Sequence, residues 1–429
     1  MSRRATAVAV LAGRYPLLSE TFVYREVRAL RARGWRVRPI ALHPPEPGQR
    51  SHVADRPVLT LYGPRRRAHL LAGMREAVRR PIRTARTLTA AWRDAVWPGE
   101  PTGLRQRATL IGQACYAIAL AARLRRMGIV HLHCHFAHAP ATVGMYAARQ
   151  LGIPFSFVGH ANDLFERRVL LKRKLTRAAF VSCISQWHRD YYRDVAASVD
   201  GKCRIIRCGV EVNGTSNGTV NGSANGSATA GRWGGHVVTV CRLVPKKGTD
   251  TLLRALASLL DDVDGPAWSL TVIGDGPERD ALRRLADDLG CASAVRWCGS
   301  LPNDEVRAQL DEADAFALPC RVDGHNDRDG IPVVLMEAMA AGVPVVAGDL
   351  PAIRELVAHE QTGLLVEASN VGAVARSLRR LRDDAGLRQR LASAGRRRVA
   401  EEFSLTCNVE RLELALRETS DRTTLAVVR

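Results

Sequence analysis

Short runs of β-branched and aliphatic residues alternate with helical patterns through both halves of the chain. In the first half, AVAVLAG, WRVRPIAL, GIVHLHCHF, PFSFVGHA, AAFVSCIS and CRIIRCGV predict strands, and SETFVYREVRALRARG predicts a helix that stops at Gly34. In the second half, HVVTVCRL, WSLTVIGDG, AVRWCGS, DAFALPC and PVVAG predict strands, and TDTLLRALASLL and PERDALRRLADDLG predict helices. Continuous apolar runs are typical of strands covered on both faces. The alternation predicts an α/β chain with two doubly wound parallel sheets.

A tract rich in Gly, Ser, Thr and Asn divides the chain. The tract NGTSNGTVNGSANGSATAGRWGG can bury almost no apolar surface, so it is predicted to be a flexible linker. A chain of 429 residues suits two domains of roughly 200 residues each. We expect an N-terminal domain over residues 1–212, the linker over 213–235 and a C-terminal domain over 236–403. A helix and tail over 404–429 follow, and this segment could cross back to the N-terminal domain.

The positive charge is confined to the N-terminal half. Residues 1–212 contain 37 Lys and Arg against 13 Asp and Glu, a net charge of +24, whereas the remaining residues carry 26 against 30, a net charge of −4. A basic half could face nucleic acid, an anionic membrane or a phosphorylated acceptor, or could be ordinary solvated surface. Aromatic residues make up 5% of the chain and no nucleic-acid-binding module is recognisable, so no nucleic-acid partner is expected.

An Arg-rich helical insertion is predicted over residues 64–97. It mixes many arginines with the apolar residues Leu70, Leu71, Met74, Val78 and Ile82. This mixture suits an amphipathic surface at a membrane interface, and it equally suits a helical hairpin packed on the domain.

Three features indicate a cytosolic chain without a membrane span. The longest apolar window, residues 108–122, is shorter than the roughly 18 residues that a span needs. The N-terminal apolar run is brief and continues into patterned structure, unlike a secretory signal. The ten cysteines are scattered without metal-binding spacing, which favours reduced thiols.

Basic residues and glycines follow two predicted strands of the C-terminal domain. Arg242, Lys246 and Lys247 come after the first strand, and Arg together with Lys is a combination that grips a pyrophosphate. Gly274 and Gly276 follow the next strand and would let the backbone approach a ligand closely. Because ligands of parallel α/β sheets bind at the carboxyl ends of strands, these residues are candidates for a binding site.

The stretch RDGIPVVLMEAMAAGVPVVA places two carboxylates around the start of an apolar helix. Pro332 suits the first helical turn, and free N–H groups near Gly330 would face an anion. Asp329 and Glu337 are eight residues apart, just over two helical turns, so both could approach one ligand from one side. The structural alternative makes Asp329 the helix cap and pairs Glu337 with Arg242 or another base.

Taken in order along the chain, these motifs resemble the family 4 (group 1) retaining glycosyltransferases with the GT-B fold. VCRLVPKKG, VIGDGPE, DGIPVVLMEAMAAGVPVVA and the LLV after HEQTG resemble the C-terminal domain of that family. YPLLSETFVYREVRAL, HLHCHFAHAPATVGMYAARQLGIPFSFVGHANDLF and IIRCGVE resemble the first domain of its colanic-acid and amylovoran type, which builds exopolysaccharides. The resemblance runs from about Val8 to Glu402 and implies two Rossmann-like domains that face each other across a cleft.

The resemblance implies a role for each matched residue. His160 would reach the sugar from the first domain, Asp329 would lie near the sugar ring, and Glu337 would bind the ribose hydroxyls. Arg242 and Lys247 would hold the diphosphate and stabilise its developing charge. His160, Asp329, Arg242 and Lys247 are the expected catalytic residues.

The same resemblance extends to further positions. The residues expected to bind the donor are Arg242, Lys247, Gly274, Gly276, Gly330, Ile331, Pro332, Val333 and Glu337. The residues expected on the acceptor side are Ser19, Glu20, His135 and Asp163. Asp163 either supports His160 or caps the following helix.

Two residues depart from the family's pattern. The first acid of the pair is usually Glu, and here it is the shorter Asp329. The Gly that usually precedes the phosphate-binding Arg is Cys241. Loss of one methylene shifts a carboxylate by about 1 Å, so donor choice or rate could differ from the family.

Three histidines alternate along one predicted strand. His131, His133 and His135 point to one side of it, with Cys134 on the other side and His138 just beyond. Three imidazoles could bind zinc, but no fourth ligand is apparent, and the resembling family has similar His runs without a metal. The acidic stretch DGHND at residues 323–327 resembles a metal-binding loop, whereas GT-B enzymes rely on basic residues. We therefore expect no metal and no cofactor besides the nucleotide sugar as co-substrate.

The sequence thus predicts a retaining, metal-independent hexosyltransferase of exopolysaccharide or cell-surface polysaccharide biosynthesis. It would move a sugar from a nucleotide sugar to a lipid-linked glycan acceptor, in the cytoplasm and peripherally on the inner face of the cytoplasmic membrane. The alternative is a non-catalytic partner that binds nucleotide sugar or polysaccharide. The joint presence of His160, Arg242, Lys247 and Glu337 argues against that alternative.

Overall fold

A computed structural model describes most of the chain. It covers residues 6–17, 20–45, 58–64, 66–96, 103–160, 164, 169–212, 215–216, 219–220, 233–262 and 267–427, with side chains up to residue 419. The chain divides into unit 1, Met1–Arg207 with Asn408–Arg429, and unit 2, Cys208–Cys407. Within the predicted linker, β8 (Thr215–Ser216) and β9 (Thr219–Val220) form an antiparallel pair. None of the helices described is long and apolar enough to cross a membrane.

Unit 1 is built on a seven-stranded parallel sheet with the order β3-β2-β1-β4-β5-β6-β7. Its strands are β1 (Ala7–Arg14), β2 (Arg36–His43), β3 (Leu59–Thr60), β4 (His131–His135), β5 (Phe155–Gly159), β6 (Phe180–Cys183) and β7 (Cys203–Ile205). Every strand except β3 overlaps a predicted run. The residues of β4, β5 and β6 are all buried, which explains why these strands are continuously apolar or neutral.

Helices cover both faces of this sheet. They are α1 (Thr21–Ala32), α4 (Leu104–Arg126), α5 (Ala139–Leu151), α7 (Leu171–Arg177), α8 (Gln186–Val195) and the short η1 (Ala197–Lys202). Leu132 and Cys134 of β4 face α5, where Gly144 leaves room for the Cys134 sulfur. The alternate residues of β4, its three histidines, face the opposite side, which α1 covers.

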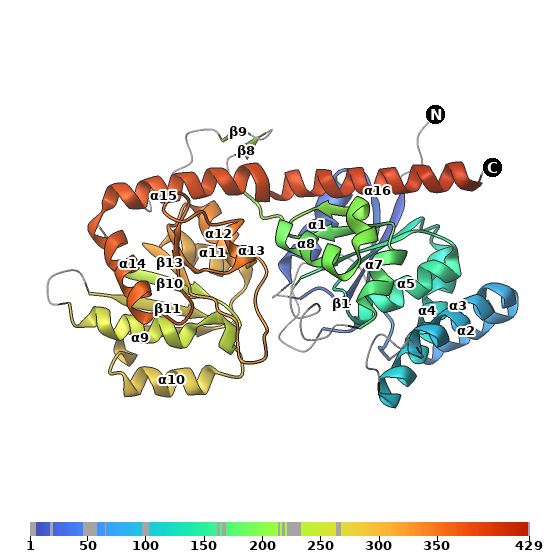
Figure 1. Cartoon of the computed structure of the whole chain (residues 1–429), viewed down its shortest axis with the longest axis horizontal. Helices are drawn as coiled ribbons and strands as arrows, with labels where there is room; N and C mark the ends of the chain where they lie inside the picture. The colour runs from blue at the N-terminus through green and yellow to red at the C-terminus, as the bar shows by residue number, and fades with distance from the viewer. Residues whose placement is uncertain are drawn as a thin grey trace. The chain divides into compact units, whose positions relative to one another are not determined.

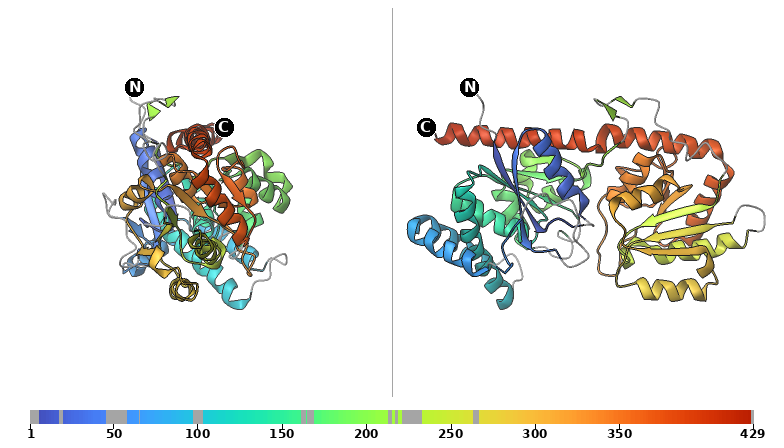
Figure 2. Two further views of the ribbon diagram at one scale, coloured as in Figure 1. Left: turned by 90° about the vertical axis from the view of Figure 1, so that its left-hand side faces the viewer. Right: turned by 180° about the vertical axis from the view of Figure 1, so that it is seen from behind.

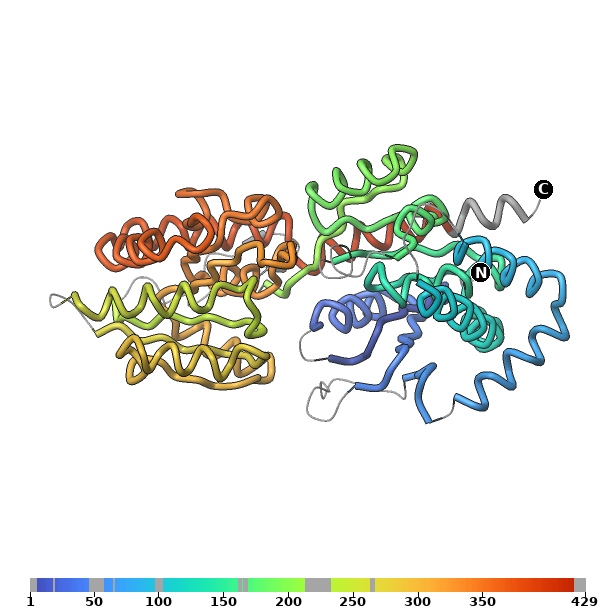
Figure 3. The backbone as a smooth tube through the Cα atoms, turned by 60° about the horizontal axis from the view of Figure 1, so that its bottom comes forward, coloured from blue at the N-terminus to red at the C-terminus, as the bar shows by residue number. Residues whose placement is uncertain are grey.

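The predicted insertion forms two helices, α2 (Arg66–Arg79) and α3 (Pro81–Ala95). Both pack on α4, and α3 also packs on α5 (Figure 3). The buried Asp94 ties α3 to the sheet helices, because it accepts hydrogen bonds from Arg177 at 2.5 and 2.8 Å and from the Tyr146 hydroxyl at 2.9 Å. We name α2 and α3 the arm; it is a helical hairpin packed on its domain.

Unit 2 is built on a six-stranded parallel sheet with the order β12-β11-β10-β13-β14-β15. Its strands are β10 (His236–Val240), β11 (Ser269–Ile273), β12 (Val295–Gly299), β13 (Ala315–Leu318), β14 (Val345–Gly348) and β15 (Leu364–Val366). One face is covered by α9 (Thr249–Leu260), α10 (Arg279–Asp288) and α14 (Val371–Asp383), and the other by α11 (Asn303–Asp311) and α12 (Val333–Ala341) (Figures 1 and 2). The short elements η2 (Pro245–Lys247), η3 (Ala292–Ala294) and α13 (Pro351–Arg354), with α15 (Ala385–Arg398) and the π-helical η4 (Val399–Phe403), complete the unit.

The last helix, α16 (Leu405–Val427), begins in unit 2 and belongs to unit 1 from Asn408 onward. The Asn408 side chain accepts a hydrogen bond from the Arg207 N–H at 2.8 Å. Arg33 at the end of α1 pairs with Glu413 at 2.6 Å and Glu410 at 3.3 Å. These contacts hold the returning helix on unit 1.

Candidate functional site

The strand order of unit 2 creates a topological switch point beside β10. The chain runs from β10 outward through β11 to β12, and then crosses to β13 on the other side of β10. In open parallel sheets, ligands bind at the carboxyl ends of the strands at such a point. The residues that follow β10 and β13 include every basic and acidic donor-site candidate of unit 2 except Glu337.

The loop after β10 presents three cations. Arg242 is exposed, and no hydrogen bond or ion pair joins it to another residue in the described parts of the chain. Lys246 and Lys247 lie in the turn η2, which ends at Gly248. Gly248 has φ of +69°, and a Cβ there would lie 2.2 Å from the Pro319 carbonyl oxygen after β13. Glycine therefore allows the loop after β10 to approach the loop after β13.

Lys247 and Asp329 form an ion pair across the switch point. Lys247 Nζ lies 2.7 Å from Asp329 Oδ2, and Lys246 Nζ lies 2.8 Å from Asp327 Oδ2 and 3.6 Å from Asp329 Oδ1. The four side chains are 12 to 14% exposed. Two cations and two anions cancel, so the exposed Arg242 carries the uncompensated positive charge of this loop.

The pairing shifts the protonation equilibria of both partners. Burial alone would raise the pKa of the Asp329 carboxyl, but Lys247 and Lys246 outweigh burial and hold that pKa below its usual range. Burial alone would lower the pKa of the Lys247 ammonium, and Asp329 raises it above its usual range. The Cys320 thiol donates a hydrogen bond to Asp329 Oδ2 at 3.2 Å, which also favours the carboxylate. Both partners are therefore charged at neutral pH.

The acidic stretch at residues 323–327 forms a turn. Asp323 Oδ1 accepts hydrogen bonds from the backbone N–H groups of His325 and Asp327, both at 2.9 Å. Asp327 in turn pairs with Lys246. The Asp323 carboxylate is thus hydrogen-bonded to the backbone, and the Asp327 carboxylate is paired with a lysine.

Gly274 and Gly276 lie against the loop after β10. A Cβ at Gly274, whose φ is +130°, would lie 1.8 Å from the Cys241 carbonyl oxygen, and one at Gly276 would lie 2.3 Å from the Leu243 carbonyl oxygen. The sequence argument expected these glycines to let backbone approach a ligand. In the structure, the close approach is to the neighbouring loop, which the glycines hold in position beside the switch point.

The start of α12 differs from the sequence argument. Pro332 is the residue before the first helical turn and α12 begins at Val333, so Gly330, Ile331 and Asp329 lie in the preceding loop. The prediction that two turns of one helix separate Asp329 from Glu337 is therefore wrong, because residues 329–332 are not helical. Asp329 is not the helix cap either.

Glu337 lies in the second turn of α12 and is half-buried. Asn303 Nδ2 donates a hydrogen bond to Glu337 Oε1 at 3.4 Å. The Glu337 carboxylate thus lies beside a neutral amide at the start of α11.

In unit 1 the described candidates gather at the carboxyl ends of β4 and β5. His135 ends β4, and His160 follows β5 with its ring stacked on His135 at 5.8 Å and tilted against Phe22 at 4.5 Å. Burial, followed by the neighbouring imidazoles, holds the pKa of His160 well below its usual range, so its ring is neutral. Its backbone carbonyl accepts a hydrogen bond from His188 Nε2 at 2.8 Å.

Of the remaining acceptor-side candidates, the structure describes Glu20. Glu20 is the residue before the first turn of α1. Ser19 and Asp163 lie outside the described residues. His160 belongs to unit 1, whereas Arg242, Lys247 and Asp329 belong to unit 2, so the expected catalytic residues form one cluster in each unit.

Sequence reasoning missed Glu26 on α1. Glu26 Oε1 accepts a hydrogen bond from His135 Nε2 at 3.0 Å and lies 3.8 Å from His133 Nε2. Helical spacing gave the signal, because Glu26 lies three residues after Val23 and four before Leu30, both buried. A carboxylate in that apolar stripe requires a polar partner from the sheet.

Comparison with known proteins assigns the class. Two family profiles match the chain, and both describe glycosyltransferases. "Glycosyl transferases group 1" matches residues 235–398, and "Glycosyltransferase Family 4" matches residues 95–213. The structure resembles sucrose-phosphate synthase from Thermosynechococcus elongatus with a TM-score of 0.69 at 18% identity, over 96% of this chain and 98% of that one. The predicted fold class, GT-B with two Rossmann-like domains, is confirmed.

Two relatives refine the class. The chain is 42% identical over 168 residues to the GDP-mannose-dependent alpha-(1-6)-phosphatidylinositol monomannoside mannosyltransferase of Mycobacterium tuberculosis, which covers 39% of this chain and 43% of that protein. It is 28% identical over 379 residues to the putative colanic acid biosynthesis glycosyltransferase WcaL of Escherichia coli, over 85% of this chain and 88% of that one. Residues 235–398 thus match the group 1 glycosyltransferases, and the chain resembles their exopolysaccharide type, as predicted.

Proposed function

We propose that this protein transfers a sugar from a nucleotide-sugar donor to a glycan acceptor, with retention of anomeric configuration and without a catalytic metal. The observation that carries the proposal is the Lys247–Asp329 ion pair at the switch point of a group 1 glycosyltransferase domain. The relatives are themselves named glycosyltransferases, which argues against a non-catalytic binding partner.

The charge arrangement supports chemistry on a diphosphate. Arg242 would attract the diphosphate first, because its charge is not neutralised by a neighbour. A diphosphate that reaches Lys247 must compete with Asp329, and displacement would free the Asp329 carboxylate to face the sugar. As the sugar bond breaks, negative charge grows on the diphosphate, and Arg242 and Lys247 would stabilise it. Fixed cations can fill the role that a metal ion has in other transferases, which supports metal independence.

The names of the relatives suggest substrates. The mycobacterial relative is named as GDP-mannose-dependent and as acting on a phosphatidylinositol mannoside, so GDP-mannose is the first donor to test. WcaL is named for colanic acid biosynthesis, which favours an exopolysaccharide or cell-surface glycan as the acceptor. A lipid-linked form of such a glycan would be met at the cytoplasmic face of a membrane.

The arm supports this location, because the apolar residues of α2 face outward. The buried residues of α2 are His69, Gly73 and Glu76; Gly73 fits against Ala119 of α4, and Glu76 pairs with Arg125 at 2.8 Å. The exposed large apolar side chains of the arm and the adjoining start of α4 are Leu70, Leu71, Met74, Val78, Ile82, Trp92, Val96 and Leu104. They are eight of the twelve such exposed side chains in the described residues. Exposed apolar side chains concentrated in one part of the chain are typical of a docking surface.

Exposed arginines surround that surface, among them Arg75, Arg79, Arg80 and Arg86. Apolar insertion combined with basic residues suits an anionic bilayer, where each Lys or Arg near the surface contributes about 1 kcal/mol. We therefore propose that the arm docks unit 1 reversibly on an anionic membrane.

One experiment tests the transfer proposal. The protein is incubated with GDP-mannose, UDP-glucose and ADP-glucose, each with and without EDTA, and released nucleotide is measured. We expect release from one donor, unchanged by EDTA, and NMR of the product should show the donor's anomeric configuration. Binding of a nucleotide sugar without any release, including with added polyprenyl-diphosphate glycans, would support the non-catalytic alternative instead.

A further inference from the structure

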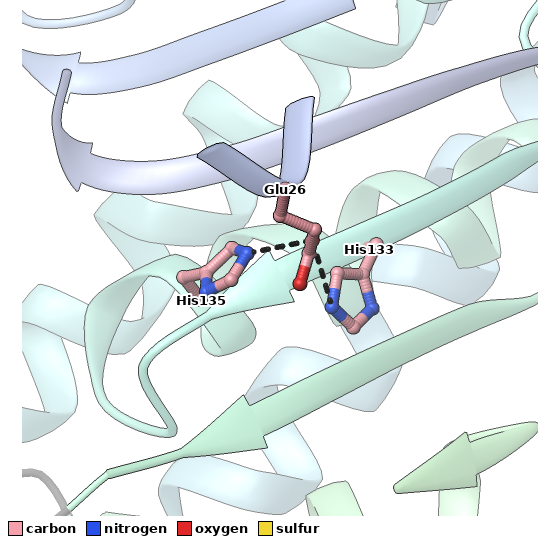
Figure 4. A group of neighbouring side chains, drawn as sticks. All are labelled: Glu26, His133 and His135. Atoms are coloured by element: carbon pink, nitrogen blue, oxygen red, sulfur yellow. Dashed lines mark hydrogen bonds and ion pairs between the residues drawn. The ribbon is translucent and has the colours of Figure 1, made fainter. Parts of the chain in front are cut away.

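Glu26, His133 and His135 bring three metal-binding atoms together in unit 1. One oxygen or nitrogen from each side chain lies within 4.8 Å of the others (Figure 4). Figure 4 shows the Glu26 carboxylate of α1 beside the two imidazoles of β4. Both histidine side chains are 2% exposed and that of Glu26 is 16% exposed, so the carboxylate is the most accessible member of the group.

The spacing of these atoms is compatible with a shared metal ion. Glu26 Oε1 lies 3.0 Å from His135 Nε2 and 3.8 Å from His133 Nε2. Ligands at about 2.0 to 2.1 Å from a tetrahedral zinc ion are about 3.4 Å apart, which lies between these two separations. His133 Nε2 is buried and makes no hydrogen bond within the described residues. An ion between Glu26 and His133 would account for that gap.

The other nitrogen of His133 is already held by a second residue. His133 Nδ1 and His131 Nε2 each lie 2.8 Å from the Ser156 hydroxyl oxygen. The hydroxyl has one proton, so it donates to one imidazole and accepts from the other. When His131 is the acceptor, His133 Nδ1–H donates to Ser156 and its Nε2 lone pair faces the Glu26 carboxylate. Two electron-rich atoms then face each other in a buried site, an arrangement that a cation stabilises.

We propose that Glu26, His133 and His135 bind one Zn²⁺ ion that joins α1 to the carboxyl end of β4. Two imidazoles and one carboxylate form a ligand set used by zinc, with a fourth position open to water. The sequence alone suggested no metal, because Glu26 lies 109 residues from His135 along the chain and its approach depends on the fold. The site belongs to unit 1 and the donor-site candidates belong to unit 2, so the proposal is compatible with transfer that needs no metal at the diphosphate.

Metal binding by the purified full chain tests this proposal. After dialysis against EDTA, the protein is titrated with Zn²⁺ and, for its visible spectrum, with Co²⁺. We expect one equivalent of tight binding and a Co²⁺ spectrum without a thiolate charge-transfer band, since the ten cysteines are not ligands. Glu26→Gln and His133→Asn should each weaken the Kd at least 100-fold. Ser156→Ala should weaken it 10- to 100-fold, because it removes only the partner of His133 Nδ1.

The matched control is the exposed pair His359 and Glu360 of unit 2, whose side chains lie 3.9 Å apart. His359→Asn and Glu360→Gln should leave the titration unchanged. Circular dichroism checks that each variant is folded, and Ser156→Ala retains all three ligands if Glu26→Gln does not fold. No binding, a thiolate spectrum, or an unchanged Kd in Ser156→Ala and in the folded ligand variants would overturn the proposal. Nucleotide release is measured separately, so neither result depends on the other.

Discussion

Lys247 Nζ and Asp329 Oδ2 lie 2.7 Å apart. Lys247 is expected to hold the diphosphate and Asp329 is expected to face the sugar. These two side chains thus form an ion pair with each other. Both side chains are largely buried, so removing either one leaves the other as an uncompensated charge. The pair therefore has two roles that can be separated experimentally, one in stability and one in turnover.

Lys247→Ala and Arg242→Ala should each lower kcat at least 100-fold, because each removes a cation that stabilises the departing diphosphate. Their effects on stability should differ. Lys247→Ala leaves Asp329 without its main partner and should reduce the free energy of unfolding by about 3 kcal/mol or more. Arg242→Ala removes an exposed side chain without partners and should change it by less than about 0.5 kcal/mol.

Steady-state kinetics and urea unfolding of the two variants check this contrast. If both variants lose equal stability, Arg242 has a structural role. Near-normal kcat in either variant would place the diphosphate site elsewhere.

Asp329→Asn should bind nucleoside diphosphate about tenfold more tightly and turn over more slowly. The neutral amide no longer competes for Lys247, but it also cannot present a carboxylate to the sugar. Asp329→Glu restores the side chain usual in the family and should retain activity or increase it. Isothermal titration with GDP and UDP, beside kcat, measures both effects. Weaker diphosphate binding by Asp329→Asn would show that Asp329 positions Lys247 rather than competing with the ligand.

Glu337→Ala should raise KM for the donor about tenfold and leave kcat nearly unchanged. Ribose contacts persist from the bound substrate to the transition state, so their loss weakens both equally. Asn303→Ala, which removes the hydrogen bond to Glu337, is the comparison and should have a smaller effect in the same direction. A fall in kcat at constant KM would assign Glu337 to the reacting centre instead.

Unit 1 should lose stability between about pH 6.5 and pH 4. Burial lowers the pKa of His133 and His188 from 6.5 to about 4, so the unfolded chain binds protons in that interval that the folded unit does not. The free energy of unfolding therefore falls as pH falls through this window. Hydrogen exchange in EDTA, followed by mass spectrometry, should show faster exchange in β4 at pH 5 than at pH 7 after correction for the intrinsic rate. Strand β13 of unit 2 is the internal reference, and equal changes in both strands would contradict the assignment.

The arm should bind anionic liposomes in a salt-dependent manner. Replacing Arg75, Arg79 and Arg86 together by Gln should weaken co-sedimentation roughly 100-fold, because each contributes about 1 kcal/mol. Val78→Asp and Ile82→Asp, at positions 81% and 68% exposed, should weaken it without unfolding the helices. Arg83 is not a suitable target, since its guanidinium donates a hydrogen bond to the Leu151 carbonyl oxygen.

The matched control replaces Arg284, Arg376 and Arg390, three exposed arginines of unit 2, by Gln. This variant should bind as the wild type does. Equal loss in both triple variants would attribute binding to total charge, and no binding of the wild type to anionic liposomes would leave the arm as solvated surface or as a contact for another protein.

The sequence by itself determined the elements and the classes of residue at their ends. The predicted runs overlap β10, β11, β13 and β14, because a strand buried on both faces must be apolar along its length, and this pattern can be read from the residues of the strand itself. The basic residues after β10 could likewise be named in advance, since the carboxyl ends of parallel strands form the ligand-binding edge.

Only the tertiary structure decided which of these residues meet. Lys247 reaches Asp329 because β13 lies beside β10, and Glu26 reaches His133 because α1 covers one face of β4. The outward apolar face of α2 is a similar case. The sequence left open whether this segment is an amphipathic surface at a membrane interface or a helical hairpin packed on the domain. In the structure Glu76 faces inward, because it pairs with Arg125 of α4. An apolar run indicates that its own residues are buried. A contact between two side chains that are distant in the sequence depends on how their segments pack, and a local sequence pattern does not predict that packing.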